Sequence, residues 1–311
     1  CQILSSLIVF KGFRAFEKSR FFKVPKMVKT DQILFKIQPT TVHTWMYHAD
    51  MLGGLAAWIL RIPNIVWCIR HSDFSRSTTK ISTFFVMKIC SLLSYVIPNN
   101  IICCSNRACF IHKSSGYDET KMTIIPNGFD IAQFTPSLRS RLQIRKELDI
   151  DDKSPVVGLI ARFHPQKNHS GFFEAAKILH KIQPEILFVL VGKGVDSSNP
   201  TIRNYINEYN LDSVVHLLGL RHDIYKIMAS LEVLVSSSSH GEAFPNVIGE
   251  AMSCGVPCVV TDVGDSAEIV GDSGEVVSVG DMDGLADQIL SLVNMPASEK
   301  AKLSTFKPLF F

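Results

Sequence analysis

The strongest chemical pattern in the sequence is the segment 241–251, in which two carboxylates stand eight positions apart. Glu242 precedes a helix predicted over 245–254, and Glu250 lies inside that helix. Pro245 suits the first helical position, where its missing N–H costs nothing. A carboxylate accepts paired hydrogen bonds from vicinal hydroxyls, such as those of a sugar or a ribose. The alternative is that one acid caps the helix and the other is solvated.

The beginning of this helix also predicts an anion-binding site. It follows a predicted strand and a serine-rich loop. Parallel sheets covered by helices bind ligands at the carboxyl ends of their strands. The free amides of a helix N-terminus and its dipole favour negative charge there. We expect the amides near 244–247 to form this site, and the expected substrate-binding residues of the segment are Gly241, Ala243, Phe244, Pro245, Asn246 and Val247. Two acids that flank a phosphate would hold both ends of a nucleotide sugar.

A pair of cations follows another predicted strand. Arg162 and Lys167 come directly after the apolar run 156–161, and Asn168 is a natural helix cap. Two cations at a strand end suit a diphosphate. In isolation, they could equally be ordinary surface cations.

The elements that position these residues alternate regularly in the second half of the chain. Strands are predicted at 156–161, 186–191, 214–218, 231–236, 256–261 and 275–279, and helices at 170–182, 200–210, 223–230, 245–254 and 281–292. Continuous apolar strands that alternate with helices predict an α/β fold with a doubly wound parallel sheet.

The first half follows the same pattern less completely. Strands are predicted at 41–45, 65–69, 101–104 and 122–125, with helices at 51–60, 77–95 and 106–115. Four strands are few for a doubly wound domain, so we expect this domain to be incomplete. The predicted organisation is a first domain over 1–130, a connection over 131–154, a second domain over 155–295 and a tail over 296–311.

Composition excludes several classes of protein. Hydrophobic residues are 46% and charged residues 20% of the chain, which rules out a disordered protein. Eight cysteines without a CxxC pair indicate buried thiols in a reducing compartment. No apolar run reaches the length of a membrane-spanning helix, and no signal peptide is visible.

Charge is distributed unevenly. Residues 1–100 contain 13 basic and four acidic residues, whereas the remainder is net acidic. Between Lys11 and Lys29, seven Lys and Arg residues alternate with Phe13, Phe16, Phe21 and Phe22. This pattern favours an anionic membrane surface. It would also suit single-stranded nucleic acid or a solvated helix beside a core. Of these, we expect the membrane surface and no nucleic acid.

Five motifs in order resemble the retaining glycosyltransferases of family 4, also called glycosyl transferases group 1. The motifs are Ile125-Pro-Asn-Gly-Phe-Asp130, Arg162 with Lys167, Val191-Gly-Lys-Gly194, Leu218-Gly219 with Asp223, and Glu242-x7-Glu250 followed by Ala251-Met-Ser-Cys-Gly-Val-Pro257. The resemblance covers roughly residues 40–292 and implies two facing Rossmann-like domains, the GT-B fold.

The resemblance implies a role for each matched residue. Arg162 and Lys167 would neutralise the donor diphosphate, Glu250 would hold the ribose hydroxyls, and Glu242 would contact the donor sugar. The amides of Phe244 to Val247 would bind phosphate or sugar. The remaining expected contacts are Gly192, Gly194, Asn127, Leu220, Arg221 as a stacking partner for the base, Asp223, His48, Asp50 and His71, of which His71 would lie near the transferred sugar. His48 and His71 could also be structural histidines.

The expected function is metal-independent transfer of a sugar, with retention, from a UDP- or GDP-sugar to a polyprenyl-linked or polysaccharide acceptor of the cell envelope. Asp281-x-Asp283 has the look of a metal-binding pair, but it opens a helix and is interpreted as a cap. We expect no cofactor, and a cytoplasmic location with peripheral attachment to the inner face of the plasma membrane. The alternatives are a nucleotide-sugar epimerase of the same fold and a non-catalytic nucleotide-sugar-binding fragment.

One family feature is not visible. The glycine-rich loop that follows the first strand of the first domain in this family has no counterpart here. We therefore expect a chain truncated at the N-terminus, and at the C-terminus because of its abrupt tail. Without that loop, activity of this chain alone would be in doubt.

Overall fold

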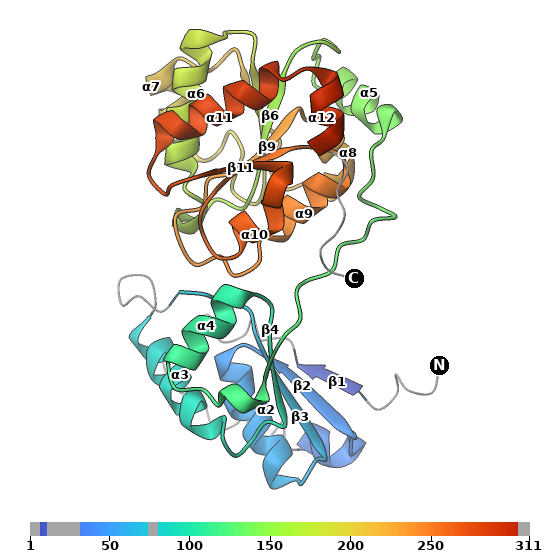
Figure 1. Ribbon diagram of the computed structural model, residues 1–311, viewed down its shortest axis with the longest axis vertical. Coiled ribbons are helices and arrows are strands. Elements are labelled where there is room, and N and C mark those ends of the chain that lie inside the picture. Colours follow the sequence, from blue (N-terminus) through green and yellow to red (C-terminus); the bar gives the residue numbers. More distant parts are fainter. Residues whose placement is uncertain (1–6, 11–31, 74–79, 304–311) are drawn as a thin grey trace. The chain divides into compact units, whose positions relative to one another are not determined.

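The computed structural model describes residues 7–10, 32–73 and 80–303, and it divides the chain into two compact units at Pro126 and Asn127. Each unit contains one parallel sheet (Figure 1). The expected α/β class is therefore confirmed. The basic segment between Lys11 and Lys29 lies outside the described residues.

The first unit is built on a five-stranded parallel sheet in the order β1-β2-β3-β4-β5. Its elements are β1 (Leu7–Phe10), β2 (Thr41–Trp45), α2 (Tyr47–Ile59), β3 (Asn64–Ile69), α3 (Ile81–Leu93), β4 (Asn100–Cys103), α4 (Asn106–Ser114) and β5 (Met122–Ile124). The prediction of four strands was wrong, because β1 adds a fifth, which pairs with β2 from Leu7 opposite Thr41 to Phe10 opposite Thr44. A four-residue apolar run carries no periodic signal of its own, and only its pairing identifies it as a strand.

The second unit is built on a six-stranded parallel sheet in the order β11-β10-β9-β6-β7-β8. Its strands are β6 (Val156–Ile160), β7 (Leu187–Val191), β8 (Val215–Leu217), β9 (Val233–Ser236), β10 (Cys258–Thr261) and β11 (Gly274–Val277). Its helices are α5 (Leu138–Glu147), α6 (His169–Ile182), α7 (Pro200–Tyr209), α8 (Ile224–Met228), α9 (Asn246–Ser253), α10 (Ser266–Val270), α11 (Met282–Asn294) and α12 (Ala297–Leu303). This is the doubly wound order that the alternation predicted.

The central strands of the second sheet are apolar along their whole length because helices cover both faces. In β6 and β9, every residue except Ile160 is buried. On one face, α6 packs against α7 and α11, and on the other, α5, α8, α9 and α10 pack in sequence (Figure 1). Phe172, Phe188 and Leu190 are fully buried in the resulting core.

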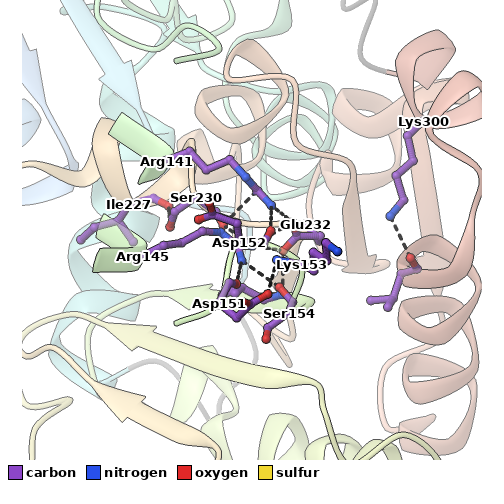
Figure 2. A network of polar contacts seen from close by, with 12 residues as sticks. Arg141, Arg145, Asp151, Asp152, Lys153, Ser154, Ile227, Ser230, Glu232 and Lys300 are labelled. Carbon is purple, nitrogen blue, oxygen red and sulfur yellow. Dashed lines mark hydrogen bonds and ion pairs between the residues drawn. The ribbon is translucent and has the colours of Figure 1, made fainter. Parts of the chain in front are cut away.

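The segment expected to connect the domains, 131–154, contains α5, which belongs to the second unit. Arg145 on α5 is 1% exposed and donates to both carboxylate oxygens of Glu232, at 2.9 and 2.7 Å. It also donates to the carbonyl oxygens of Asp151 and Ser154, at 2.6 and 2.9 Å (Figure 2). These bonds fasten the segment to the strand that contains Val233 and make it a structured part of the unit.

Candidate functional site

The candidate site begins at the switch point of the second sheet. β6 and β9 are neighbours, and the chain continues from β6 toward β7 and from β9 toward β10 on opposite sides. Doubly wound sheets bind their ligands at the carboxyl edge at this point, between the loops that follow the two strands, and we call this place the crevice. The loop after β6 carries Arg162 and Lys167, and the loop after β9 carries Glu242.

Glu242 joins these two loops. It is 8% exposed, and its Oε1 accepts hydrogen bonds from Lys167 Nζ at 2.5 Å, Ser238 Oγ at 3.0 Å and Gln166 Nε2 at 3.2 Å. Two residues predicted separately, Glu242 and Lys167, are thus brought together. The sequence analysis missed Gln166 and Ser238, although both stand inside the segments that it singled out.

Arg162 stands at the end of β6 with an exposed side chain. Its guanidinium makes no hydrogen bond or ion pair with any residue that the structure describes. Its backbone neighbour Phe163 is fixed, because the amide of Phe163 donates to the carbonyl of Lys193 at 2.9 Å. A guanidinium whose N–H groups have no protein acceptor can donate two parallel hydrogen bonds to an anion such as a diphosphate.

Helix α9 begins beside this crevice. Pro245 is the N-cap and not the first helical residue as predicted, since its ψ of 100° is extended. The amides of Asn246 and Val247 are the first of the helix and have no intrahelical acceptor. Ala243 and Phe244 are buried, and Gly241 takes a positive φ of 74° at the turn before them. Binding of an anion at this helix N-terminus stays a prediction.

Glu250 lies one turn into α9 and differs from Glu242 in its surroundings. Its side chain is half-buried and forms no hydrogen bond or ion pair within the described part of the chain. Burial raises the pKa of the Glu250 carboxyl above its ordinary value. A half-buried carboxylate without donors gains from hydroxyl groups that replace the water it has lost.

The first residues of the second unit fold onto α9. Asn127 Nδ2 donates to Asn246 Oδ1 at 2.7 Å, and the Phe129 ring stacks on Phe244 at 6.0 Å between centroids. Phe129 also covers Gly249, where an added Cβ would lie 2.1 Å from the ring. Asn127 was predicted, whereas Phe129 was missed within the same quoted motif.

The glycines after β7 shape the backbone of the crevice. Gly192 has a φ of 154°, and a Cβ there would lie 2.0 Å from the carbonyl oxygen of Ala161. Its amide donates to the carbonyl of Gly219 at 2.8 Å, so three strand-end loops are locked together. Gly194 also takes a positive φ, of 77°. Their contact with a ligand stays a prediction.

Arg221 is held in a fixed orientation by two acids. Its Nε and Nη2 each donate to Asp223 at 2.8 Å, and its Nη1 donates to Glu147 Oε1 at 2.5 Å. The hydrogen bonds from Arg221 lower the pKa of Asp223. Asp223 thus orients the arginine, and Leu220 beside it is 64% exposed. Glu147 was missed because it comes from α5, far away in the sequence.

The first unit places its predicted residues differently. Asp50 was expected to face a cleft, but it is 1% exposed, and Thr44 Oγ1 donates to its Oδ1 at 2.6 Å. Burial raises the pKa of Asp50 to about 7. His48 is half-buried, which lowers its pKa. His71 follows β3 at the carboxyl edge, where its Nδ1 accepts from the amide of Asp73 at 3.3 Å.

Two expectations about structural residues are confirmed. Asp281 caps α11 by accepting a hydrogen bond from the amide of Gly284 at 2.8 Å. The cysteines that the structure describes are free thiols, and all but Cys109 are buried. Within residues 7–10, 32–73 and 80–303, no group of His, Cys, Asp or Glu side chains has the arrangement of a metal site, and no helix is long and apolar enough to cross a membrane.

Sequence comparison identifies two family models in this chain. The model described as glycosyl transferases group 1 matches residues 140–305, and the model described as glycosyltransferase family 4 matches residues 6–133. The first match covers more than half of the chain and contains the whole crevice of the second unit.

Two curated relatives act on lipid-linked sugars by name. The UDP-Gal:alpha-D-GlcNAc-diphosphoundecaprenol alpha-1,3-galactosyltransferase of Escherichia coli is 29% identical over 273 residues, which is 86% of this chain and 70% of that protein. The N,N'-diacetylbacillosaminyl-diphospho-undecaprenol alpha-1,3-N-acetylgalactosaminyltransferase of Campylobacter jejuni is 30% identical over 193 residues, which is 61% of this chain and 49% of that protein.

A solved structure shows the same fold. Anabaena Alr3699/HepE, crystallised with UDP and glucose, superposes with a TM-score of 0.79 at 24% identity, over 90% of this chain and 75% of that one. The likeness supports the GT-B fold, with two Rossmann-like domains.

Proposed function

Because the chain belongs to the glycosyl transferases group 1 family, we propose that it transfers a sugar from a nucleotide diphosphate sugar to the hydroxyl of a lipid-linked or polysaccharide acceptor. The E. coli relative is named for a UDP-galactose donor, and the Anabaena structure holds UDP. Both support UDP over GDP as the donor nucleotide. The diphosphoundecaprenol acceptors in the names of two relatives support a lipid-linked acceptor.

The observation that carries this proposal is the contrast between the two carboxylates of the α9 segment. Glu242 already has three donors, whereas Glu250 has none among the described residues and is half-buried. Glu250 therefore suits paired ribose hydroxyls, and the amides of Asn246 and Val247 before it suit a phosphate. Helix amides that suit a phosphate, followed one turn later by a carboxylate that suits ribose hydroxyls, match the two ends of a nucleoside diphosphate.

The chemistry follows from charge. When the bond between sugar and diphosphate breaks, negative charge develops on the leaving group, and cations and helix amides stabilise it. Arg162 is open for this role, and Lys167 reaches the same crevice while held by Glu242. These fixed positive groups can perform the electrostatic work of a metal ion, which supports a metal-independent reaction.

We also propose retention of the anomeric configuration. The resemblance to the retaining glycosyltransferases of family 4 implies it, and the two relatives described above are named for α-1,3 linkages. Oε1 of Glu242 accepts from Lys167, Gln166 and Ser238, which holds the carboxylate in place and leaves Oε2 as the proposed acceptor for a sugar hydroxyl. His71, at the carboxyl edge of the first sheet, is the proposed contact of the transferred sugar. Action on a lipid-linked acceptor supports a cytoplasmic, peripheral position at the inner face of the plasma membrane.

The test is donor binding by Glu250→Gln. UDP-, GDP- and ADP-sugars are added without metal, and the melting temperature is followed, since a ligand of the folded state raises it by mass action. We expect a UDP-sugar to stabilise the wild type, and the variant to bind about tenfold or more weakly, because charge-assisted hydrogen bonds are lost.

The matched control is Glu208→Gln, an exposed glutamate on α7 outside the crevice. It should bind like the wild type. Equal binding by Glu250→Gln and the wild type would contradict the assignment of Glu250. The absence of any nucleotide-dependent change in melting temperature, in all three proteins, would contradict the donor site.

A further inference from the structure

The outer face of α3 is apolar where a solvated helix face is ordinarily polar. Val86, Met87 and Cys90 point into the first unit and are buried. The opposite face bears large apolar side chains at intervals of three or four residues, which places them on one line along the helix. This α3 stripe consists of Ile81, Phe85, Ile89 and Leu92 on the helix and Val96 in the turn that follows it, which are 74%, 62%, 45%, 74% and 61% exposed.

Neighbouring elements of the first unit also carry exposed large apolar side chains. Helix α2 packs against α3, and Trp58 and Ile59 at its C-terminal end are 49% and 56% exposed. Tyr95, just after the end of α3, is 58% exposed. Single exposed apolar residues are normal, but a continuous exposed row of large ones marks an interaction surface.

Charge around the stripe selects the kind of partner. From residue 74 to residue 117, the sequence contains five Lys and Arg residues and no acidic residue. Exposed Lys80 stands at the N-cap position of α3 without a side-chain capping bond. Exposed Lys88 stands on the helix beside Phe85 and Ile89, and its Nζ donates to the carbonyl oxygen of Ser115 at 3.3 Å on the exposed surface. Long lysine side chains can reach past an apolar face toward negative charge. A protein partner with an apolar face would provide no reason for the absence of every acid.

We propose that the α3 stripe docks the first unit on a bilayer surface that carries anionic lipids. An apolar helix face bordered by lysines lies in the interface, with its apolar side chains among the acyl chains and its cations among the headgroups. α3 follows β3, so its first turn lies at the carboxyl edge of the sheet, where His71 stands. Docking would bring that edge near a lipid-linked acceptor. The inference goes beyond the proposed function, because docking requires no donor.

The experiment is flotation of the full chain with vesicles. One set contains phosphatidylcholine alone and the other phosphatidylcholine with phosphatidylglycerol. We expect binding to the anionic vesicles that weakens in high salt, since surface charges are screened. Phe85→Ser with Leu92→Ser should abolish most of the binding, and Lys80→Glu with Lys88→Glu should weaken it by roughly tenfold or more.

The matched controls take exposed residues of the same types from α5. Leu138→Ser, at a site 71% exposed, and Lys146→Glu should leave binding unchanged. All substituted side chains are exposed, so each variant should keep its circular dichroism spectrum and its UDP-sugar-dependent melting shift. A variant that loses vesicle binding but keeps the nucleotide shift separates this inference from the proposed function.

Three outcomes would overturn the proposal. The first is a wild-type chain that floats with neither set of vesicles. The second is vesicle binding that persists in the Phe85 and Leu92 double variant, which would assign docking to another part of the chain. The third is a concentration-dependent dimer in sedimentation velocity that this double variant abolishes, which would make the stripe an interface between two copies.

Discussion

At the scale of residues, the crevice of the second unit contrasts groups that are held with groups that are open. Glu242, Lys167 and Arg221 are fixed by hydrogen bonds before any ligand arrives. Arg162 and Glu250 have no such partner within the described ranges. Preformed contacts reduce the cost of ordering the site, and open charges supply the binding energy.

Arg162→Ala should impair catalysis without affecting the fold. Removal of one charged donor from a developing anion costs about a hundredfold to a thousandfold in rate, and loss of an exposed, unpaired side chain costs less than about 0.5 kcal/mol of stability. Nucleotide release from the donor sugar gives kcat/KM, and thermal unfolding gives stability. Arg203→Ala, an exposed arginine on α7, is the control. An unchanged kcat/KM would remove Arg162 from the site.

Asp50→Asn should change how stability depends on pH. The buried carboxyl has a folded-state pKa of about 7, above the ordinary 3.8, so the folded chain holds this proton more tightly than the unfolded chain. Its contribution is therefore complete below about pH 4 and is lost as the pH rises toward 7, by up to about 4 kcal/mol. As the pH rises across this range, the wild type should lose stability relative to the variant, whose Asn does not titrate. A difference in unfolding free energy between the two that is constant from pH 4 to 8 would contradict this prediction.

At the scale of elements, α5 is joined to the second unit by charge as well as by packing. Arg145 on α5 lies buried among Glu232 and the backbone carbonyls of the loop 151–154, and Arg141 also pairs with Glu232 (Figure 2). The same helix supplies Glu147, which orients Arg221. A helix in the expected connection thus contributes to the wall of the crevice.

Arg145→Ala should destabilise the second unit by about 3–5 kcal/mol, because it removes two donors from the Glu232 carboxylate, which keeps only Arg141 and the amide of Val156, and removes the guanidinium donors from the carbonyls of the loop 151–154. Denaturant unfolding measures this loss. Arg139→Ala, at an exposed position on the same helix, should change stability by less than about 0.5 kcal/mol. Similar losses in the two variants would show that helix propensity, and not the buried ion pair, dominates.

At the scale of the whole molecule, each unit has its own sheet and its own buried core. Trp67, Ile69 and Ile101 are buried in the first unit, and Phe172 and Phe188 are buried in the second. The residues proposed to bind the donor nucleotide all lie in the second unit. Ligand binding should therefore stabilise the two units unequally.

Calorimetry of the full chain should show two unfolding transitions. UDP should raise the midpoint temperature of only one of them. The transition whose midpoint temperature UDP raises should be the one whose midpoint temperature Arg145→Ala lowers, since both effects act on the second unit. Asp50→Asn should change the midpoint temperature of the other transition, which belongs to the first unit. A single transition that all three changes move together would mean that the units unfold cooperatively.

The sequence by itself determined the pattern of elements and the family. Parallel strands covered on both faces must be apolar throughout, so runs such as 156–161 and 186–191 were visible without any tertiary information. β2 was predicted with the bounds that the structure has. The glycine, proline and charged residues of the five motifs are local signals, and the family model confirms the membership that they indicated.

Only the tertiary structure decided which groups meet and which are buried. β1 became recognisable through its pairing with β2, and Asp50 on α2 is buried where Thr44 of β2 donates to it. The bonds from Lys167 to Glu242 and from Arg221 to Glu147 join residues more than 70 positions apart. The α3 stripe is distinguished from a core-facing stripe only by its exposure. Such features depend on non-local packing, which a local pattern of residue types does not encode.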